Sequence, residues 1–208
     1  MSFIVLCAGG HARVVIEALL SCGIHPAAVA DRNVARIGEA IGGVKITGSD
    51  DDVLKMAADT VELANGLGNR ASRSDSGLSG RRALFDRFAA QGYKFPVIAH
   101  ASAVVASDAQ LGDGAQVMAG AVIQPAARIG RNVLVNTRAV VEHDCIVGDH
   151  AHVAPGAVLC GGVSIGESVH IGAAAVVLVG VKVGAGAVVA AGAVVKKDVA
   201  AGGFAGNE

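Results

Sequence analysis

Aliphatic residues recur at every sixth position through the second half of the chain. Sixteen successive positions of this kind, from Val105 to Val195, hold only valine, leucine or isoleucine. A second column four residues later, from Ala115 to Ala193, holds only alanine, valine or cysteine. A six-residue unit with one large and one small inward side chain is typical of the hexapeptide repeat of a parallel β-helix. Three units close one coil, so residues 101–208 predict an all-β prism of about five coils.

Glycine often follows the aliphatic residue of the repeat. We interpret these glycines as corner residues whose backbone angles other amino acids rarely adopt. They are Gly112, Gly130, Gly148, Gly166, Gly172 and Gly184. No long insertion interrupts the repeat between residues 105 and 195, so an active site in this half must lie on the faces or corners of the prism.

The first 100 residues follow a different pattern, in which short apolar segments alternate with stretches of helical spacing. We expect strands at 3–7, 27–30, 44–47 and 61–67, and helices at 14–20 and 84–90. Such alternation indicates a small parallel sheet of the Rossmann-like, doubly wound type. The predicted fold is therefore an α/β domain over residues 1–100 followed by a β-helix over residues 101–208.

Composition supports this division and excludes some functions. Five of the six aromatic residues lie in the first 100 residues, and Phe204 is the only one in the second half. The chain has 17 Lys and Arg against 18 Asp and Glu, so its net charge of −1 offers no basic surface for nucleic acid or an anionic membrane. The longest uncharged apolar run, 171–181, is shorter than the roughly 20 residues of a membrane-spanning helix.

The N-terminus and the cysteines bear on the cellular compartment. No basic residue precedes the first apolar stretch, so we expect no secretory signal and a cytoplasmic location. The four cysteines, Cys7, Cys22, Cys145 and Cys160, show no CxxC spacing, which disfavours a zinc site or a disulfide framework. We expect free thiols, with Cys145 in the inward column and therefore in the core.

Two features of the α/β domain could bind a nucleotide. The turn Gly9-Gly10-His11 joins a strand to a helix, where glycine allows the backbone to approach a phosphate. Because the turn lacks a complete GxGxxG fingerprint, it favours a mononucleotide or a nucleotide-sugar over a dinucleotide, although it could also be a plain connecting turn. Asp31 ends the second strand and could accept hydrogen bonds from a ribose or a base, or simply face solvent.

Histidines in the repeat provide candidates for catalysis. His143 lies two residues beyond the inward Val141, on an outward corner between Glu142 and Asp144. A carboxylate can hold one ring nitrogen and leave the other free as a base, although a lone surface histidine is usually only solvated. His152 and His170 are 18 residues apart, so they stack in one outward column as a groove contact, a weak metal site or plain surface.

Cys160 precedes a pair of glycines, Gly161 and Gly162, at a corner of the repeat. Their backbone N–H groups could donate to the oxygen of a reacting carbonyl.

These motifs together resemble the sugar O- and N-acetyltransferases related to sialic-acid O-acetyltransferase and to the bacterial UDP-4-amino-sugar N-acetyltransferases. The resemblance covers nearly the whole chain. It is carried by the GGHA turn at 9–12, Asp31, Asn136-Thr137, the EHDC corner at 142–145, the segment 148–156 and the CGGV segment at 160–163. It implies a left-handed β-helix, a homotrimer, acetyl-CoA in grooves between neighbouring β-helices, no metal, and a UDP- or GDP-linked amino sugar on the N-terminal domain.

The resemblance also implies a role for individual residues. His143 is the catalytic base, Asp144 orients it, and Asn136 makes a polar contact beside it. His152, Gly161 and Gly162 contact the thioester end of acetyl-CoA. The residues implied in substrate binding are Gly9, Gly10, His11, Asp31, Arg32, Gly68 and Asn69.

We therefore predict an acetyl-CoA-dependent sugar acetyltransferase of cell-surface polysaccharide synthesis, acting on an amino group or on a hydroxyl. One alternative is a non-catalytic module that binds a sugar nucleotide. Another is a metalloenzyme like the gamma-type carbonic anhydrases, which share the scaffold but carry a His-x₄-His pair. Residue 148, five positions after His143, is glycine, so this chain lacks that pair.

Overall fold

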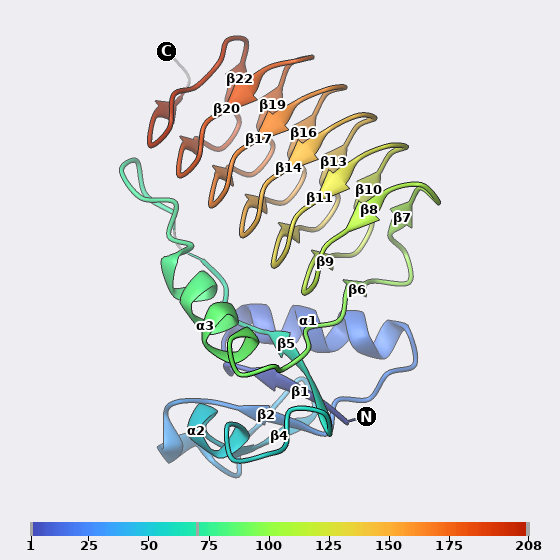
Figure 1. Ribbon diagram of the computed structural model, residues 1–208, viewed down its shortest axis with the longest axis vertical. Coiled ribbons are helices and arrows are strands. Elements are labelled where there is room, and N and C mark those ends of the chain that lie inside the picture. Colours follow the sequence, from blue (N-terminus) through green and yellow to red (C-terminus); the bar gives the residue numbers. More distant parts are fainter. Residues whose placement is uncertain (1, 70, 207–208) are drawn as a thin grey trace.

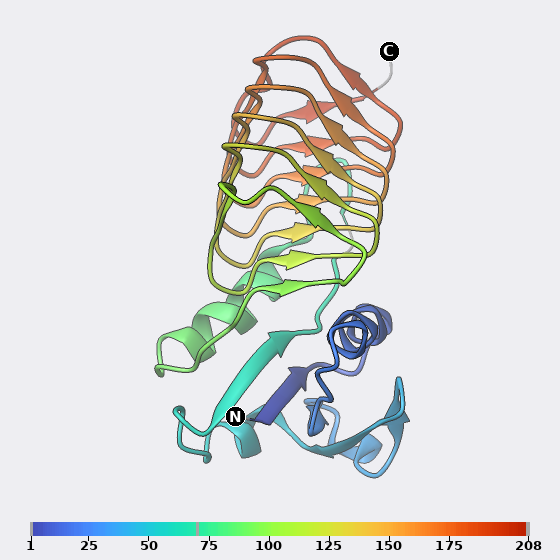
Figure 2. The same ribbon diagram turned by 90° about the vertical axis from the view of Figure 1, so that its right-hand side faces the viewer.

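The computed structural model describes residues 2–69 and 71–206 and contains two parts, an α/β domain and a three-sided β-helix that stands on it (Figures 1 and 2). The α/β domain has one sheet of order β3-β4-β2-β1-β5, parallel except for the β3–β4 pair. Its strands are β1 (Ser2–Leu6), β2 (Ala28–Ala30), β3 (Ala40–Ile41), β4 (Val44–Gly48) and β5 (Val61–Asn65).

The helices of this domain are α1 (Gly10–Ser21), the 3-10 turn η1 (Val34–Arg36), α2 (Asp50–Val53) and α3 (Ser79–Ala89). The apolar side of α1 packs through Val15, Ile16 and Leu19 into a core shared with the first coils of the β-helix. Helix α3 packs Phe85 and Phe88 into a second core that includes β5. The aromatic residues thus fill the space between helices and sheet, as their restriction to this half of the chain predicts.

The β-helix consists of two-residue strands that form three parallel faces. The covered face packs against the α/β domain and contains β6 (Ile98–Ala99), β9 (Gln116–Val117), β12 (Leu134–Val135), β15 (His152–Val153), β18 (His170–Ile171), β21 (Val188–Val189) and β23 (Phe204–Ala205). The valine face contains β7 (Val104–Val105), β10 (Val122–Ile123), β13 (Val140–Val141), β16 (Val158–Leu159), β19 (Val176–Val177) and β22 (Val194–Val195). The third face contains β8 (Gln110–Leu111), β11 (Arg128–Ile129), β14 (Ile146–Val147), β17 (Ser164–Ile165) and β20 (Lys182–Val183).

The core of the prism is the double column that the sequence predicts. Both the aliphatic column and the column of small residues are buried from Ala115 to Val195, and Cys145 lies among them. Neighbouring coils pair 18 residues apart, for example Val140 with Val158. Because each coil carries only one or two methyl-rich side chains per side, the axis is filled without aromatic rings.

The glycines after the aliphatic residue have a different role from the one predicted. None of them adopts a positive φ; instead, a Cβ at Gly148 would lie 2.7 Å from the backbone nitrogen of Glu167 in the next coil. The other five are likewise close to the backbone of the next coil. The left-handed backbone conformation, with positive φ, occurs two residues later in the repeat. Asn132, Asp144 and His150 adopt it there, and so do glycines of other coils. Close packing of the coils, and not backbone angle, requires glycine after the aliphatic residue.

The α/β domain extends a polar loop along the covered face (Figure 1). In this loop Ser72 and Asp75 form an isolated antiparallel β-bridge. The Arg73 guanidinium lies 4.8 Å from the centre of the Phe204 ring in the last coil. From α3, Arg82 forms an ion pair with Glu167 on the prism at 2.5 Å. The two parts of the chain therefore contact one another over most of the length of the prism.

Candidate active site

His143 lies on the corner between the valine face and the third face, just after β13. Its side chain is 63% exposed, and its Nδ1 is 2.8 Å from Oδ2 of Asp144. Asp144 adopts φ +59°, in the left-handed position of the corner, which brings its carboxylate back toward the preceding ring. A carboxylate on Nδ1 holds the proton on that nitrogen and leaves Nε2 with a free lone pair.

Gly161 lies beside the free nitrogen of His143. A Cβ at position 161 would be 2.6 Å from His143 Nε2, so the ring and the glycine backbone are in direct contact. The Gly161 carbonyl accepts a hydrogen bond from Gly180 N–H, and Gly162 N–H donates to the His143 carbonyl. The Gly161 N–H donates to none of the residues that the structure describes. The corner therefore offers a base and a backbone donor side by side.

Asn136 and His152 form a pair at a different place in the chain. Asn136 follows β12 and lies on the corner between the covered face and the valine face, and its Nδ2 is 3.0 Å from His152 Nε2. One chain alone therefore does not bring Asn136 beside His143, since the valine face separates their corners. His152 and His170 do stack in register, with ring centres 5.1 Å apart. Their interpretation as surface residues is wrong for His152, which is 5% exposed beneath the α/β domain.

Amide side chains fix which nitrogen carries the proton in the buried histidines. Asn136 Oδ1 accepts from Thr137 N–H, so its Nδ2 donates to His152 Nε2 and the proton of neutral His152 is on Nδ1. Gln116 Nε2 donates to the Asn65 carbonyl, so Gln116 Oε1 accepts from His11 Nε2–H at 2.9 Å. The two hydrogen bonds of Gln116 join the start of α1 and the end of β5 to the covered face.

The electrostatics of this interface favour neutral imidazoles. Burial lowers the pKa of His11 to about 4, with a further contribution from Arg81. Burial also lowers the pKa of His152 well below its ordinary value, and His170 and Arg81 add to the effect. Arg81 is 1% exposed; its Nη1 donates to the carbonyls of Asn65 and Leu67, and burial lowers its pKa to about 9. The hydrogen bonds of Asn65 and Gln116 across the interface hold the two parts of the chain together. Sequence patterns gave no signal for Asn65, Arg81 or Gln116.

A cavity of about 450 Å³ opens at the carboxyl edge of the α/β sheet, where ligands bind in open parallel sheets. Arg32, predicted as a substrate residue, lines it. The other lining residues are Cys7, Val34, Ser49, Asp50, Asp51, Leu67, Gly80, Ala83, Leu84 and Arg87. All of them belong to the α/β domain, so this cavity and the His143 corner are separate sites within one chain.

Cys7 and Asp50 are functional candidates that the sequence analysis missed. Cys7 is not glycine and yet adopts φ +71°, a strained conformation that often marks a functional turn. Burial, together with Asp50 and Asp31, raises the pKa of its thiol to about 11. Asp50 follows β4 as Asp31 follows β2. Because the carboxyl ends of parallel strands meet at one edge, this equivalence was the available signal.

The remaining predicted substrate residues lie next to the cavity or at the interface. Asp31 accepts from Ala8 N–H at 2.7 Å and from Asn33 N–H at 2.8 Å, so both of its oxygens already hold the backbone. Gly9 and Gly10 begin α1, where an added Cβ would meet no atom within 4 Å. An added Cβ at Gly68 would lie 3.3 Å from the Cβ of His11. Asn69 Nδ2 contacts His170 Nδ1 at 3.0 Å.

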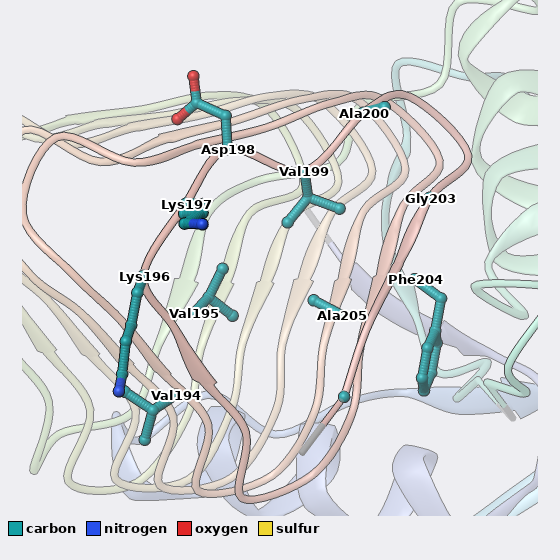
Figure 3. Close-up of a pocket in the computed structure, with 11 residues that line it drawn as sticks. Val194, Val195, Lys196, Lys197, Asp198, Val199, Ala200, Gly203, Phe204 and Ala205 are labelled. Atoms are coloured by element: carbon teal, nitrogen blue, oxygen red, sulfur yellow. The ribbon is translucent and has the colours of Figure 1, made fainter. Parts of the chain in front are cut away.

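A second cavity, of about 740 Å³, is the open end of the prism. It is lined by residues 194–200 and 203–206 (Figure 3). Val195 and Ala205 lie within the last coil, and the carboxylate of Asp198 points away from it (Figure 3). None of the predicted site residues lines this cavity.

Two further observations limit the chemistry of the described part of the chain. Its His, Cys, Asp and Glu side chains form no group of three that could hold a metal ion. None of its helices is both long and apolar enough to cross a membrane.

Comparison with known proteins supports the acetyltransferase interpretation. Residues 2–76 match the PglD N-terminal domain, residues 126–161 the bacterial transferase hexapeptide, and residues 162–197 the hexapeptide repeat of succinyl-transferase. No curated protein sequence matches the chain.

Solved structures match almost the whole chain. The acetyltransferase domain of PglB from Neisseria gonorrhoeae, in complex with acetyl coenzyme A, is 31% identical with a TM-score of 0.89, over 99% of this chain and 96% of that one. PerB from Caulobacter crescentus, in complex with CoA and GDP-perosamine, is 34% identical with a TM-score of 0.89, over 100% and 94%. WeeI from Acinetobacter baumannii is 24% identical with a TM-score of 0.82, over 98% and 95%, and this match concerns the fold alone.

These matches confirm the predicted fold class of an α/β domain followed by a left-handed β-helix, and they confirm the resemblance found in the sequence. The chain belongs to the hexapeptide-repeat sugar N-acetyltransferases that carry a PglD-type N-terminal domain.

Proposed function

We propose that the protein transfers the acetyl group of acetyl-CoA directly to the amino group of a nucleotide-linked sugar, with His143 as the general base. One observation carries this proposal: Asp144 holds Nδ1 of His143 at 2.8 Å, while Nε2 lies against Gly161. The base and a free backbone N–H are thus available at one point on a rigid corner.

The proposed reaction needs no covalent intermediate on the protein. The amine nitrogen attacks the thioester carbonyl while His143 Nε2 accepts a proton from the amine. The new C–N bond forms, the C–S bond breaks, and the CoA thiolate leaves with the proton that His143 returns. Gly161 N–H donates to the carbonyl oxygen as negative charge develops there. A sugar hydroxyl could react by the same steps, and analysis of the acetylated product distinguishes the two acceptors.

The position of His143 supports a site that is built by more than one copy of the chain. Within one chain, His143 lies on the corner that does not adjoin the covered face, away from the α/β domain and its cavity. The valine face separates this corner from that of Asn136. Packing between copies at the valine face would bring His143 of one copy toward the Asn136 corner of the next.

The valine face has the character of such an interface. Its outward residues form one continuous apolar column, in register between successive coils: Val104, Val122, Val140, Val158, Val176 and Val194. Val104 is 61% and Val194 is 49% exposed in the single chain, and the four valines between them are half-buried. A contiguous apolar column that stays partly exposed is typical of an interaction site. We propose a homotrimer, with closure by three taken from the family resemblance, and acetyl-CoA bound between neighbouring prisms.

Substitution of His143 tests the proposal. In His143→Ala, we expect kcat for CoA release to fall by at least about 10²-fold, in line with the usual contribution of a general base. The thermal midpoint should stay unchanged because the side chain is mostly exposed. His25→Ala, which also removes an exposed histidine, is the matched control. A folded His143→Ala protein with near-normal turnover would exclude His143 as the base.

A further inference from the structure

We propose that Cys145 is a positioning residue, which holds the Cys160–Gly161 peptide so that its N–H group points outward to the reacting thioester. This inference rests on the proposed function, because it concerns the backbone donor of the same reaction. It gives a role to a buried thiol that the mechanism leaves unused.

Cys145 differs from the other inward side chains of the prism. Every other member of the column of small residues, from Ala115 to Ala193, is alanine or valine, and the residues one coil before and after Cys145 are Ala127 and Val163. Among the inward side chains of the described coils, the thiol of Cys145 is therefore the one polar group. A thiol is a weak donor, and a buried donor needs an acceptor.

The acceptor of this thiol is the carbonyl of Cys160. Sγ of Cys145 lies 3.1 Å from the carbonyl oxygen, whereas the backbone nitrogen of Val163, which also donates to it, lies 3.4 Å away. Burial raises the pKa of the Cys145 thiol, although the N–H groups of Val163 and Gly162 oppose the rise, so the sulfur keeps its proton and can donate. The Cys160 carbonyl is thus held toward the inside of the prism.

The direction of this carbonyl fixes the direction of the Gly161 N–H group. No peptide bond of the described residues is cis, so the C=O and N–H of the Cys160–Gly161 peptide point to opposite sides of the chain. A carbonyl turned inward to Cys145 therefore turns the N–H outward, at the corner where the His143 ring lies against Gly161. The hydrogen bond to the carbonyl also polarises the peptide, which strengthens the N–H as a donor. Cys145 thus acts through this peptide.

Two pairs of variants separate the hydrogen bond from the volume of the side chain. Cys145→Ser and Cys145→Thr keep a donor on Cβ, whereas Cys145→Ala and Cys145→Val remove it. Threonine and valine have nearly the same shape, and valine already occupies this position in the next coil. We expect Cys145→Ala and Cys145→Val to lower kcat for CoA release by about 3- to 10-fold, the contribution of one neutral hydrogen bond. Each hydroxyl variant should be faster than its apolar partner by about the same factor.

Two further measurements distinguish a positioning role from a structural one. The KM for acetyl-CoA and the apparent pKa of the pH–rate profile should keep their wild-type values in all four variants, because the donor acts in the transition state and the base is unchanged. Val181→Ala trims the equivalent inward residue two coils further on and is the control for packing. It should lower the thermal midpoint and leave kcat unchanged.

Wild-type kcat in all four Cys145 variants overturns the inference. An equal decrease in all four also overturns it, since the cysteine then acts only through its volume. A higher KM for acetyl-CoA with an unchanged kcat overturns it as well and assigns Cys145 to ground-state binding. His143→Ala, measured alongside, keeps the two proposals apart. If His143→Ala is inactive while the Cys145 variants match the wild type, only this inference fails. Near-normal turnover of His143→Ala overturns the proposed function and, with it, the site on which this inference rests.

Discussion

Adding a single methyl group at Gly161 should disable the proposed base without changing the fold. In Gly161→Ala the new Cβ would lie 2.6 Å from His143 Nε2 and 2.7 Å from Cε1. The ring must retreat by about 0.8 Å to reach an ordinary contact of 3.4 Å. The backbone of Gly161 cannot retreat as easily, because its carbonyl accepts from Gly180 N–H and its neighbour Gly162 donates to His143. The mostly exposed imidazole therefore moves.

The expected loss follows from the size of this displacement. A misplacement of about 1 Å can cost on the order of 10²-fold in rate, so kcat should fall by about this factor. The thermal midpoint should change little, since the ring moves into solvent. Steady-state CoA release and thermal unfolding measure the two effects. Gly186→Ala is the control for turnover: an added Cβ there meets no atom within 4 Å, and at equivalent corners Ala126 and Ala174 adopt a positive φ. Because Gly186 itself has φ +69°, this control is expected to lower the thermal midpoint somewhat without slowing CoA release.

A double variant isolates the mechanism of the loss. If Gly161→Ala acts only by displacing His143, then His143→Ala with Gly161→Ala should be no slower than His143→Ala alone. Turnover of Gly161→Ala at the wild-type rate would refute the packing argument. A double variant much slower than His143→Ala would show that position 161 acts on the thioester independently of the ring.

Two more predictions concern assembly and acid stability. Val140→Asp with Val158→Asp places two carboxylates in the apolar column of the valine face, and each one buried in an interface should cost several kcal/mol. We expect folded monomers that have lost turnover in sedimentation and activity assays; monomers active at the wild-type rate would exclude a shared site. His11 has a folded-state pKa of about 4, below its ordinary 6.5, so the unfolded chain binds more protons between these values and stability falls as pH falls through that window. At pH 5 the free energy of unfolding should be about 2 kcal/mol lower than at pH 7 or above because of His11 alone. Urea unfolding of His11→Gln should show a smaller decrease between these pH values. An unchanged pH dependence in this variant would contradict the burial argument.

Local sequence patterns were informative wherever one chemical constraint repeats. In the prism, every coil must fill the same narrow axis and pair with the coil below, so each hexad repeats one large and one small inward residue. The outward stack of His152 on His170 and the position of His143 on a corner follow from the same spacing. Glycine was misinterpreted because its two uses, positive φ and close backbone approach, look identical in a sequence. Only the contact of Gly148 with the next coil distinguishes them.

Residues at the interface between the two parts were not predictable in this way. Asn65, Arg81 and Gln116 are polar residues without a repeat or a motif, and their partners lie up to 105 residues away in the chain. His152 looked like a surface residue because the repeat alone leaves it outward, and the domain that covers it is encoded elsewhere. The orphaned oxygen of Asp50 is likewise a property of everything around it.

The sequence by itself therefore determined the two fold types, the inward columns and the corner position of His143. These features follow from spacing along the chain, because the six-residue repeat of side-chain types matches the six-residue strand-and-corner repeat of the β-helix backbone. Tertiary structure alone decided that His152 is buried, that Gly161 contacts the His143 ring, and that Asn136 and His143 occupy different corners. It also decided that Oδ1 of Asp50 has no hydrogen-bond partner within residues 2–69 and 71–206. Such properties depend on which distant segments meet, because burial and hydrogen bonding are set by neighbours in space and not by neighbours in sequence.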